Sequence, residues 1–312
     1  MQLIRGLHNL KKSEQGCVLT IGNFDGVHRG HQEILKRLIN CAGNYGLPSA
    51  VMFFEPHPEE LFRPDNSPPR MSRFRDKITF LRGFGIEQLI LVKFSREFSQ
   101  MSAEHFLKEI LINQLGVKHL IVGDDFHFGH QRQGNFDYLA SHCEELGFDL
   151  ERTSTLTEDG ERISSTAVRQ ALQNNDLQKA EKLLGRPYII SGKVVHGDKR
   201  GRTIGFPTAN VLLQRKVSPL HGVFAVEVEF FDGKENVTIY GVANIGKRPT
   251  VGGHRLQLEV HLFNWSRDIY GEHITVKFVR FIRAEKKFAD FEQLKAQIAR
   301  DSQTAKEIFD IT

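Results

Sequence analysis

The segment CVLTIGNFDGVHRGH, residues 17–31, carries the clearest structural signal in the first half of the chain. It begins with an apolar run, Cys17–Gly22, that is typical of a buried strand. A glycine-rich turn follows, which allows tight turning and a close approach of the backbone to a ligand. In Gly30–Tyr45 the apolar residues then recur with helical spacing. A strand, a turn and a helix in this order predict one unit of a parallel α/β sheet.

The same alternation continues to about Leu184. Further strands are expected at Ser49–Phe54, Gln88–Val92 and His119–Gly123. Further helices are expected at Ser72–Phe84, Ser102–Leu115, Asn135–Leu146 and Asp176–Leu184. This pattern predicts a parallel sheet with helices on both faces, in which ligands bind beyond the carboxyl ends of the strands.

Beyond Gly185-Arg186-Pro187 the apolar residues alternate with period two. Gly-rich turns separate these strand-like runs, which predicts a small antiparallel barrel or sandwich. The runs are Phe224/Val226/Val228/Phe230, Leu256/Leu258/Val260/Leu262 and His273–Ile282. The tail Asp290–Phe309 has a helical pattern, and its expected packed face consists of Phe291, Leu294, Ile298 and Ile308.

The composition fits two ordinary globular domains. The chain has 312 residues, of which 40% are hydrophobic and 26% charged, and no apolar run is long enough for a membrane span. The cysteines Cys17, Cys41 and Cys143 form no CxxC pair, which argues against a structural zinc site and favours a reducing cytoplasm. A net charge of +4 suits anionic substrates, and neither a helix-turn-helix nor a basic helix points to nucleic acid. The oligomeric state stays open.

The turn in Gly22–His31 has the chemistry of a phosphate site. The first N–H groups of the helix are free, and the positive end of its dipole favours an anion. His28 and His31 stand three residues apart, so both rings can face one way and donate hydrogen bonds to phosphate oxygens. The alternatives are a purely structural histidine pair, or a metal site with Asp25 that has no obvious further ligand.

A second anion motif is expected at Arg162–Arg169, RISSTAVR. Ser164 or Ser165 would cap a helix there, Thr166 and the free N–H groups would meet phosphate, and Arg169 would neutralise charge. Helix capping alone is the alternative. The loops FEPHP, residues 54–58, and GDDFHFG, residues 123–129, follow two strands and carry aromatic rings on which a flat ligand could stack, unless these rings are ordinary core.

The second half opens with a basic, glycine-rich segment. Lys193–Lys216 contains six Lys or Arg residues and one Asp, a charge of +5, which suits a polyphosphate unless the segment is a solvated hairpin. Thr208 and Asn210 supply neutral oxygens for Mg²⁺, with phosphate oxygens completing its shell. Glu259 alternates with Leu258 and Val260, so it lies on the opposite strand face from them, where a carboxylate can accept a hydroxyl proton or simply be exposed.

These strings resemble known enzyme families. Gly22–His31 resembles the HxGH motif of the nucleotidyltransferase superfamily, whose members attack the α-phosphate of a nucleoside triphosphate and release pyrophosphate. The strings that resemble the riboflavin kinase domain are Gly192–Asn210, Gly222–Val226, Gly241–Thr250, Leu258–His261 and Tyr270-Gly271. Since the motifs occur in order over essentially the whole length, the chain resembles the bifunctional prokaryotic riboflavin kinase/FAD synthetase family.

The resemblance implies a Rossmann-like α/β nucleotidyltransferase domain over residues 1–185 and a small antiparallel β-barrel kinase domain with a C-terminal helix over residues 186–312. The barrel would transfer the γ-phosphate of ATP, with Mg²⁺, to the ribityl 5′-hydroxyl of riboflavin, giving FMN and ADP. The first domain would join FMN to AMP from a second ATP, giving FAD and pyrophosphate. The FMN phosphate is itself the nucleophile, so rate would come from alignment and charge neutralisation.

The resemblance also implies roles for individual residues. Glu259 would be the general base of the kinase, and His28, His31 and Arg169 would act in adenylyl transfer. The ATP contacts of the first domain would be Gly22, Asn23, Phe24, Asp25, His28, His31, Ser164, Ser165, Thr166 and Arg169. Its flavin contacts would be Phe54, Pro56, His57, Pro58, Asp125 and Phe128. The ATP contacts of the kinase would be Gly197, Gly201, Gly205, Thr208 and Asn210, of which Thr208 and Asn210 would also hold Mg²⁺.

Two positions depart from the family pattern. His127 stands where many members have arginine, and Asn264 where aspartate is common. Two other functions remain to be weighed. One is a single-activity nucleotidyltransferase whose barrel only senses flavin, against which the Thr208, Asn210 and Glu259 set argues. The other is a non-enzymatic regulator, which would need a DNA-reading module that the sequence lacks.

Overall fold

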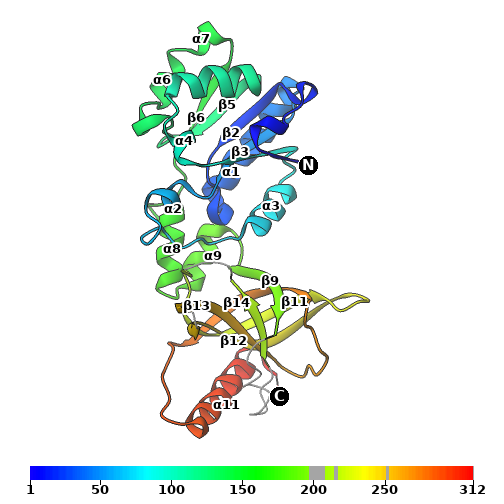
Figure 1. Ribbon diagram of the computed structural model, residues 1–312. Coiled ribbons are helices and arrows are strands. Elements are labelled where there is room, and N and C mark those ends of the chain that lie inside the picture. Colours follow the sequence, from blue (N-terminus) through cyan, green and yellow to red (C-terminus); the bar gives the residue numbers. More distant parts are fainter. Residues whose placement is uncertain (197–207, 214–216, 251–252, 312) are drawn as a thin grey trace. The chain divides into compact units, whose positions relative to one another are not determined.

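A computed structural model describes residues 1–196, 208–213, 217–250 and 253–311 of the protein. The chain divides into two compact units, drawn in Figure 1. The first comprises Met1–Pro68 and Phe74–Ser164, and the second comprises Pro69–Arg73 and Ser165–Thr312. Within the described ranges, no helix combines the length and the apolar character needed to cross a membrane.

The first unit is built on a six-stranded sheet with the order β1-β4-β3-β2-β5-β6, in which all neighbours are parallel. Its strands are β1 (Gln2–Arg5), β2 (Cys17–Ile21), β3 (Ser49–Glu55), β4 (Gln88–Lys93), β5 (Val117–Gly123) and β6 (Asp149–Thr153). The four central strands confirm the sequence prediction. The edge strands β1 and β6 were not predicted, because their short segments mix charged and apolar residues.

Helices cover both faces of this sheet, as predicted. Leu35 of α1 and Leu81 of α3 share one apolar cluster with Val18, whereas Leu107 of η4 shares the other with Leu19. Since adjacent strand residues point to opposite faces, the two clusters lie on opposite sides of β2. The helices of this unit are α1 (Arg29–Tyr45), α2 (Pro58–Phe62), α3 (Phe74–Gly83), α4 (Arg96–Ser99), α5 (Ala103–His105), the π-helix η4 (Phe106–Gln114), α6 (Phe136–Ala140) and α7 (Cys143–Leu146).

Short elements complete the first unit. The 3₁₀ turns are η1 (Leu7–Asn9), η2 (Lys12–Glu14), η3 (Asp25–Val27) and η5 (His130–Arg132), and a small hairpin consists of β7 (Thr157–Glu158) and β8 (Glu161–Arg162). The expected helix Asn135–Leu146 was wrong as one element, since it is broken between α6 and α7. There the side chains of Ser141 and His142 both hydrogen-bond to the Tyr138 carbonyl, at 2.9 and 2.8 Å. Such bonds compete with a continuous helix.

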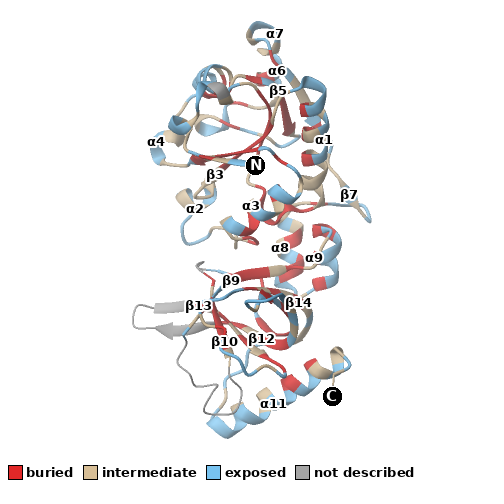
Figure 2. Ribbon diagram, turned by 90° about the vertical axis from the view of Figure 1, so that its right-hand side faces the viewer, coloured by how far each residue is buried: buried red, intermediate tan, exposed pale blue. Residues whose placement is uncertain are grey.

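The second unit contains a closed antiparallel barrel with the strand order β10-β13-β12-β11-β14-β9. Its strands are β9 (Ile189–Val195), β10 (Thr208–Leu212), β11 (Gly222–Phe231), β12 (Asn236–Thr250), β13 (Gly253–Leu262) and β14 (His273–Arg283). The alternating residues of β11 and of Leu256–Leu262 are buried, as their period of two predicted. Figure 2 shows buried segments in red along labelled barrel strands such as β9 and β12. The helices α8 (Ser165–Gln173) and α9 (Leu177–Leu184) belong to this unit.

The C-terminal helix α11 (Phe291–Ile308) is present as expected, but its packed face differs. Phe291 was expected to pack on the barrel, yet it is 49% exposed. Ile308 joins a small apolar cluster with the barrel, as expected, and Ala305, which was not predicted, is a buried member of the same cluster. Asp301 of the same face is buried and forms a bidentate ion pair with Arg283 of β14. An apolar pattern alone could not reveal that a charged pair forms this contact.

Candidate active sites

The start of α1 holds the two histidines of the first motif side by side. His28 is the N-cap of the helix, and its Nδ1 accepts a hydrogen bond of 3.3 Å from the backbone N–H of His31. The two rings are stacked with their centroids 3.6 Å apart. The spacing of three residues therefore does place both imidazoles together at a helix N-terminus, where an anion is favoured.

The turn before α1 has an unusual backbone. Phe24, Gly26 and Val27 have positive φ angles of 49°, 77° and 42°. For a β-branched residue such as Val27 this region is strained, and such strain often marks a functional turn. Asp25 in the same turn is only 5% exposed. At Gly22, an added Cβ would lie 3.1 Å from the Phe24 ring, so this close approach favours glycine.

A buried lysine supports this turn. Lys77 of α3 donates a hydrogen bond of 2.6 Å to the carbonyl oxygen of Asn23, and its Nζ lies 5.1 Å from the centre of the Phe53 ring. The residue is 6% exposed. Lys77 belongs to none of the sequence motifs. The available signal was its position on the apolar face of α3, three residues after Phe74 and four before Leu81.

The second motif begins beside the first. An added Cβ at Gly30 would lie 3.4 Å from the carbonyl oxygen of Ile163, and Arg29 forms an ion pair of 2.6 Å with Glu158. The start of α1 and the segment that leads into Ser164 are thus in contact within the first unit.

The rest of the second motif lies in α8. This helix begins at Ser165, as the expected capping implies, and it includes Thr166 and Arg169 in the second unit. The Nε of Arg169 donates a hydrogen bond of 2.9 Å to the Pro69 carbonyl. The motif is therefore a helix N-terminus with a cation one turn in, which is the arrangement that phosphate binding requires.

The loop after β5 is organised by Arg162. Its guanidinium lies 3.1 Å from a carboxylate oxygen of Asp124 and 3.0 Å from one of Asp125. A hydrogen bond from Thr155 holds the pKa of Asp124 below its usual range, and Arg162 acts in the same direction. Of the two aspartates, the proposed flavin contact Asp125 is the more exposed, with 72% of its side chain open to solvent.

Two of the expected flavin contacts belong to one aromatic cluster. Phe54 of β3 and Phe128 are linked through Phe98 and Phe106, with successive ring centroids 5.7, 6.2 and 5.4 Å apart. Phe128 is only 8% exposed, so it is part of the apolar core in addition to its expected contact with the flavin.

The FEPHP loop follows β3 directly. His57 caps α2 by accepting a hydrogen bond of 3.2 Å from the N–H of Glu59, and Pro58 is the first residue of that helix. Pro56 follows a cis peptide bond.

The first departure from the family pattern is His127. A histidine ring nitrogen can either donate or accept a hydrogen bond, whereas arginine only donates. The Nδ1 of His127 lies 2.9 Å from the Asp125 carbonyl and 3.2 Å from the Arg132 guanidinium. Asn264 has a φ of 52°, a conformation that both asparagine and aspartate tolerate.

In the barrel, the strand register brings the predicted kinase residues together. Asn210 of β10 is directly opposite Glu259 of β13, and Glu259 is opposite Asn244 of β12 on its other side. Asn210 is 6% exposed, and its side-chain oxygen accepts a hydrogen bond from Gln257. Directly opposed residues project from the same face of a sheet, so Asn210 and Glu259 share one face.

A cavity of about 120 Å³ lies next to these strands. Thr208 and Asn210 line it, together with Trp265, Asp268 and Tyr270. Glu259 is not one of the described residues that line this cavity. The oxygens of Thr208 and Asn210 are the hard, neutral donors that fit Mg²⁺ when phosphate supplies the remaining ligands. The expected ATP contacts Gly197, Gly201 and Gly205 lie outside the described residues.

Comparison with known proteins agrees with both halves of this description. A sequence model of FAD synthetase matches residues 10–167, and one of riboflavin kinase matches residues 184–309. A bifunctional riboflavin kinase/FMN adenylyltransferase from Escherichia coli (strain K12) is 53% identical, and the match covers 100% of this chain and 99% of the relative. One from Haemophilus influenzae is 51% identical over 99% of each chain.

A solved structure has the same fold over nearly the whole length. It is described as a macrolide-efflux protein from Streptococcus pneumoniae, and the match has a TM-score of 0.82 and 30% identity over 98% of this chain and 99% of that one. The two family models match consecutive parts of the chain, and the relatives are more than 50% identical over nearly its full length. The chain belongs to the family of bifunctional riboflavin kinase/FMN adenylyltransferases.

Proposed function

We propose that the chain phosphorylates riboflavin to FMN in its C-terminal domain and adenylylates FMN to FAD in its N-terminal domain, each step with its own ATP. The boundary that we propose is near residue 185. It is supported by the end of the FAD synthetase match at residue 167 and the start of the riboflavin kinase match at residue 184. This boundary keeps α8, with its phosphate motif, in the adenylyltransferase.

The observation that carries the adenylyltransferase assignment is the stacked pair His28 and His31 at the start of α1, next to Ile163. The imidazoles would hold ATP phosphates through hydrogen bonds, aided by the free N–H groups of the helix. Ser164, Ser165 and Thr166 would meet the phosphates at the start of α8. Charge that develops as pyrophosphate leaves would be neutralised by Arg169.

The FMN phosphate supplies the attacking oxygen, so the protein needs to align two anions rather than provide a nucleophile. Phe54 and Phe128 would hold the flavin ring by stacking, and Asp125 would contact its polar edge. The remaining ATP contacts would be Gly22, Asn23, Phe24 and Asp25, and the remaining flavin contacts would be Pro56, His57 and Pro58.

The kinase assignment rests on the row that Asn210 and Glu259 form across β10 and β13. Glu259 would accept the proton of the ribityl 5′-hydroxyl as this oxygen attacks the γ-phosphate. Thr208 and Asn210 would hold Mg²⁺, which when bound neutralises charge on the phosphates. The glycines Gly197, Gly201 and Gly205 would bring the backbone close to ATP.

Product analysis of two variants tests this division of work. Each variant is supplied with ATP and Mg²⁺, and either riboflavin or FMN, and the flavins are separated by chromatography. Glu259→Gln should stop FMN formation and leave FAD synthesis from supplied FMN intact. His28→Ala should do the reverse. Glu229→Gln, which changes an exposed glutamate of β11, serves as the control and should leave both steps unchanged. Loss of both steps in either folded variant would refute the assignment.

A further inference from the structure

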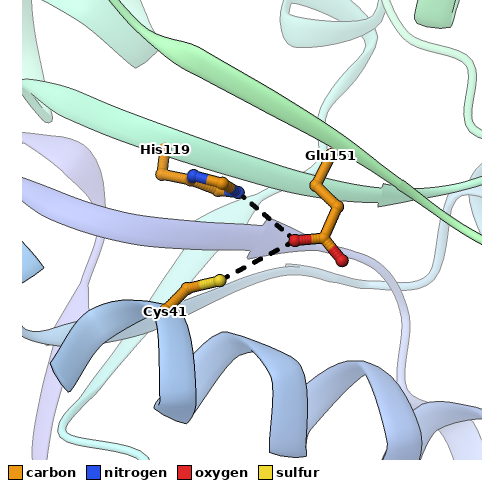
Figure 3. A group of neighbouring side chains, drawn as sticks. All are labelled: Cys41, His119 and Glu151. Atoms are coloured by element: carbon orange, nitrogen blue, oxygen red, sulfur yellow. Dashed lines mark hydrogen bonds and ion pairs between the residues drawn. The ribbon is translucent and has the colours of Figure 1, made fainter. Parts of the chain in front are cut away.

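A cluster of three side chains lies in the first unit, outside the proposed active sites. Cys41 of α1, His119 of β5 and Glu151 of β6 each bring one potential ligand atom within 4.8 Å of the others (Figure 3). The Nε2 of His119 is 3.6 Å from a carboxylate oxygen of Glu151, and the Cys41 sulfur is 3.7 Å from the same oxygen. Three separate elements of the fold therefore converge on one point.

The separations suit a tetrahedral metal ion. With metal bonds of about 2.3 Å to sulfur and about 2.0–2.2 Å to nitrogen and oxygen, the ligand atoms of a zinc site lie roughly 3.3–3.6 Å apart. The oxygen of Glu151 lies 3.6 Å from Nε2 of His119 and 3.7 Å from the Cys41 sulfur, close to this range, and all three atoms lie within 4.8 Å of one another, so a modest movement of the side chains would seat an ion.

The tautomer of His119 favours a metal. Tyr45 donates its single hydroxyl proton to Asp149. The Nδ1 of His119 lies 3.2 Å from the same hydroxyl oxygen, which can then only accept from an Nδ1–H. In a neutral ring this leaves the Nε2 lone pair facing the cluster. Nε2 is buried and has no hydrogen-bond partner among the described residues.

Glu151 is also held in place from outside the cluster. Its other oxygen accepts a hydrogen bond of 3.2 Å from Arg37, whereas the oxygen that faces the cluster accepts one from the Cys41 thiol, whose proton a metal ion would replace. Metal-binding histidines and carboxylates are typically fixed by such outer hydrogen bonds. Here Tyr45 would fix His119 and Arg37 would fix Glu151.

We propose that Cys41, His119 and Glu151 form a three-ligand site for a divalent metal of borderline softness, Zn²⁺ foremost, with water as the fourth ligand. A mixed sulfur, nitrogen and oxygen set favours zinc over magnesium, which prefers oxygen alone. Binding displaces the thiol proton of Cys41 to solvent. The missing CxxC spacing is no obstacle, because the ligands come from three elements.

This site is remote from the phosphate motif. Cys41 follows His28 by 13 residues along the chain, which corresponds to about 20 Å along a helix. Changes at the metal site are therefore expected to leave nucleotide contacts at the start of α1 intact. The competing interpretation is an ion pair between a protonated His119 and Glu151, with the thiol as a neighbour.

Cobalt provides the test, because a thiolate bound to Co²⁺ gives a charge-transfer band in the near ultraviolet. The full chain without a tag is stripped with a chelator, dialysed and titrated with Co²⁺. One equivalent should produce this band and strong tetrahedral bands in the visible, and Zn²⁺ should abolish them. Co²⁺ held by oxygens at a nucleotide site would give no thiolate band.

Variants identify the ligands. Cys41→Ser should remove the charge-transfer band, and Tyr45→Phe should weaken binding by roughly 10- to 100-fold, as loss of an outer hydrogen bond typically does. Cys143→Ser changes another partly buried thiol, and it should keep both the band and the affinity. Circular dichroism checks that each variant is folded, and His119→Ala replaces Cys41→Ser if the latter does not fold.

Either of two spectral results would overturn the proposal. One is the absence of a thiolate band in the folded wild-type chain, and the other is its persistence in Cys41→Ser. A melting temperature that Zn²⁺ raises in the wild type but not in Cys41→Ser would support the site independently. An equal rise in both would contradict it.

Discussion

Lys77 shows how one buried charge can organise a site. Its ammonium group donates a hydrogen bond to the Asn23 carbonyl oxygen, so a buried positive charge contacts the start of the turn Asn23–Val27. A buried lysine is costly unless it is hydrogen-bonded or paired. Its presence on an otherwise apolar helix face is therefore explained by the turn rather than by the stability of α3.

We expect Lys77→Met to lower the rate of FAD formation from FMN by about 10- to 100-fold, because a hydrogen bond from a charged group is lost. FMN formation from riboflavin should not change. Steady-state assays of the two half-reactions measure this. Lys36→Met, at an exposed position of α1, is the control. Unchanged FAD synthesis in a folded Lys77→Met protein would show that Lys77 does not support the turn.

Thr208 allows a similar test in the barrel. Thr208→Val keeps the shape of the side chain and removes the hydroxyl, so FMN formation should fall about tenfold, the effect of one lost hydrogen bond or ligand. The Mg²⁺ concentration needed for half-maximal rate should rise. Thr238→Val makes the same change at an exposed position of β12 and should have no effect. An unaltered Mg²⁺ dependence in Thr208→Val would show that Thr208 is not a ligand of Mg²⁺.

At the scale of elements, the contact of α11 with the barrel depends on Asp301. This residue is 4% exposed, and both of its carboxylate oxygens accept hydrogen bonds from Arg283, at 2.6–3.0 Å. Removing one partner of a buried pair leaves the other charge uncompensated, which typically costs about 3–5 kcal/mol.

Asp301→Ala should therefore lower the free energy of unfolding of the second unit by about 3 kcal/mol, since Arg283 stays partly exposed and regains some water. Trp265, the single tryptophan of the chain, reports on this unit through its fluorescence in a urea titration. Glu307→Ala, an exposed change on the same helix, should cost less than about 0.5 kcal/mol. Equal midpoints for both variants would mean that the pair contributes nothing.

The elements that the sequence predicted share strong local signals. β2 and α1 were predicted because apolar periodicity and a glycine-rich turn coincide there. α9 was predicted as a short helical stretch that ends before Gly185, and in the structure Asp176 and Gly185 cap its two ends. The break between α6 and α7 depends on hydrogen bonds from the side chains of Ser141 and His142 to the Tyr138 carbonyl. The apolar periodicity of the sequence carries no information about such bonds.

The site residues divide in the same way. Motifs such as His28 and His31, three residues apart, are visible in the sequence. The Asn210–Glu259 pairing depends on barrel register, and the Lys77–Asn23 bond on how α3 meets the turn. Such long-range contacts cannot be obtained from spacing along the chain.

At the scale of the molecule, charge is distributed unevenly. The chain carries +4 in total, of which Lys193–Lys216 contributes +5, so the remainder sums to −1. Most of the basic residues of this segment lie outside the described ranges; within the described ranges, its first residue Lys193 belongs to β9 and Thr208 to β10. An excess of positive charge in the stretch of sequence that contains Thr208 and Asn210 suits ATP, a polyanion, as the ligand of this stretch.

The two proposed sites are independent of each other, so FMN made in one molecule can be adenylylated in another. The most direct measurement mixes the two variants Glu259→Gln and His28→Ala and follows FAD formation from riboflavin, ATP and Mg²⁺ over time. Neither variant alone should produce FAD from riboflavin. The mixture should, after a lag in which FMN accumulates. If the mixture produces no FAD although each variant retains its own half-reaction, the claim of two independent sites is contradicted.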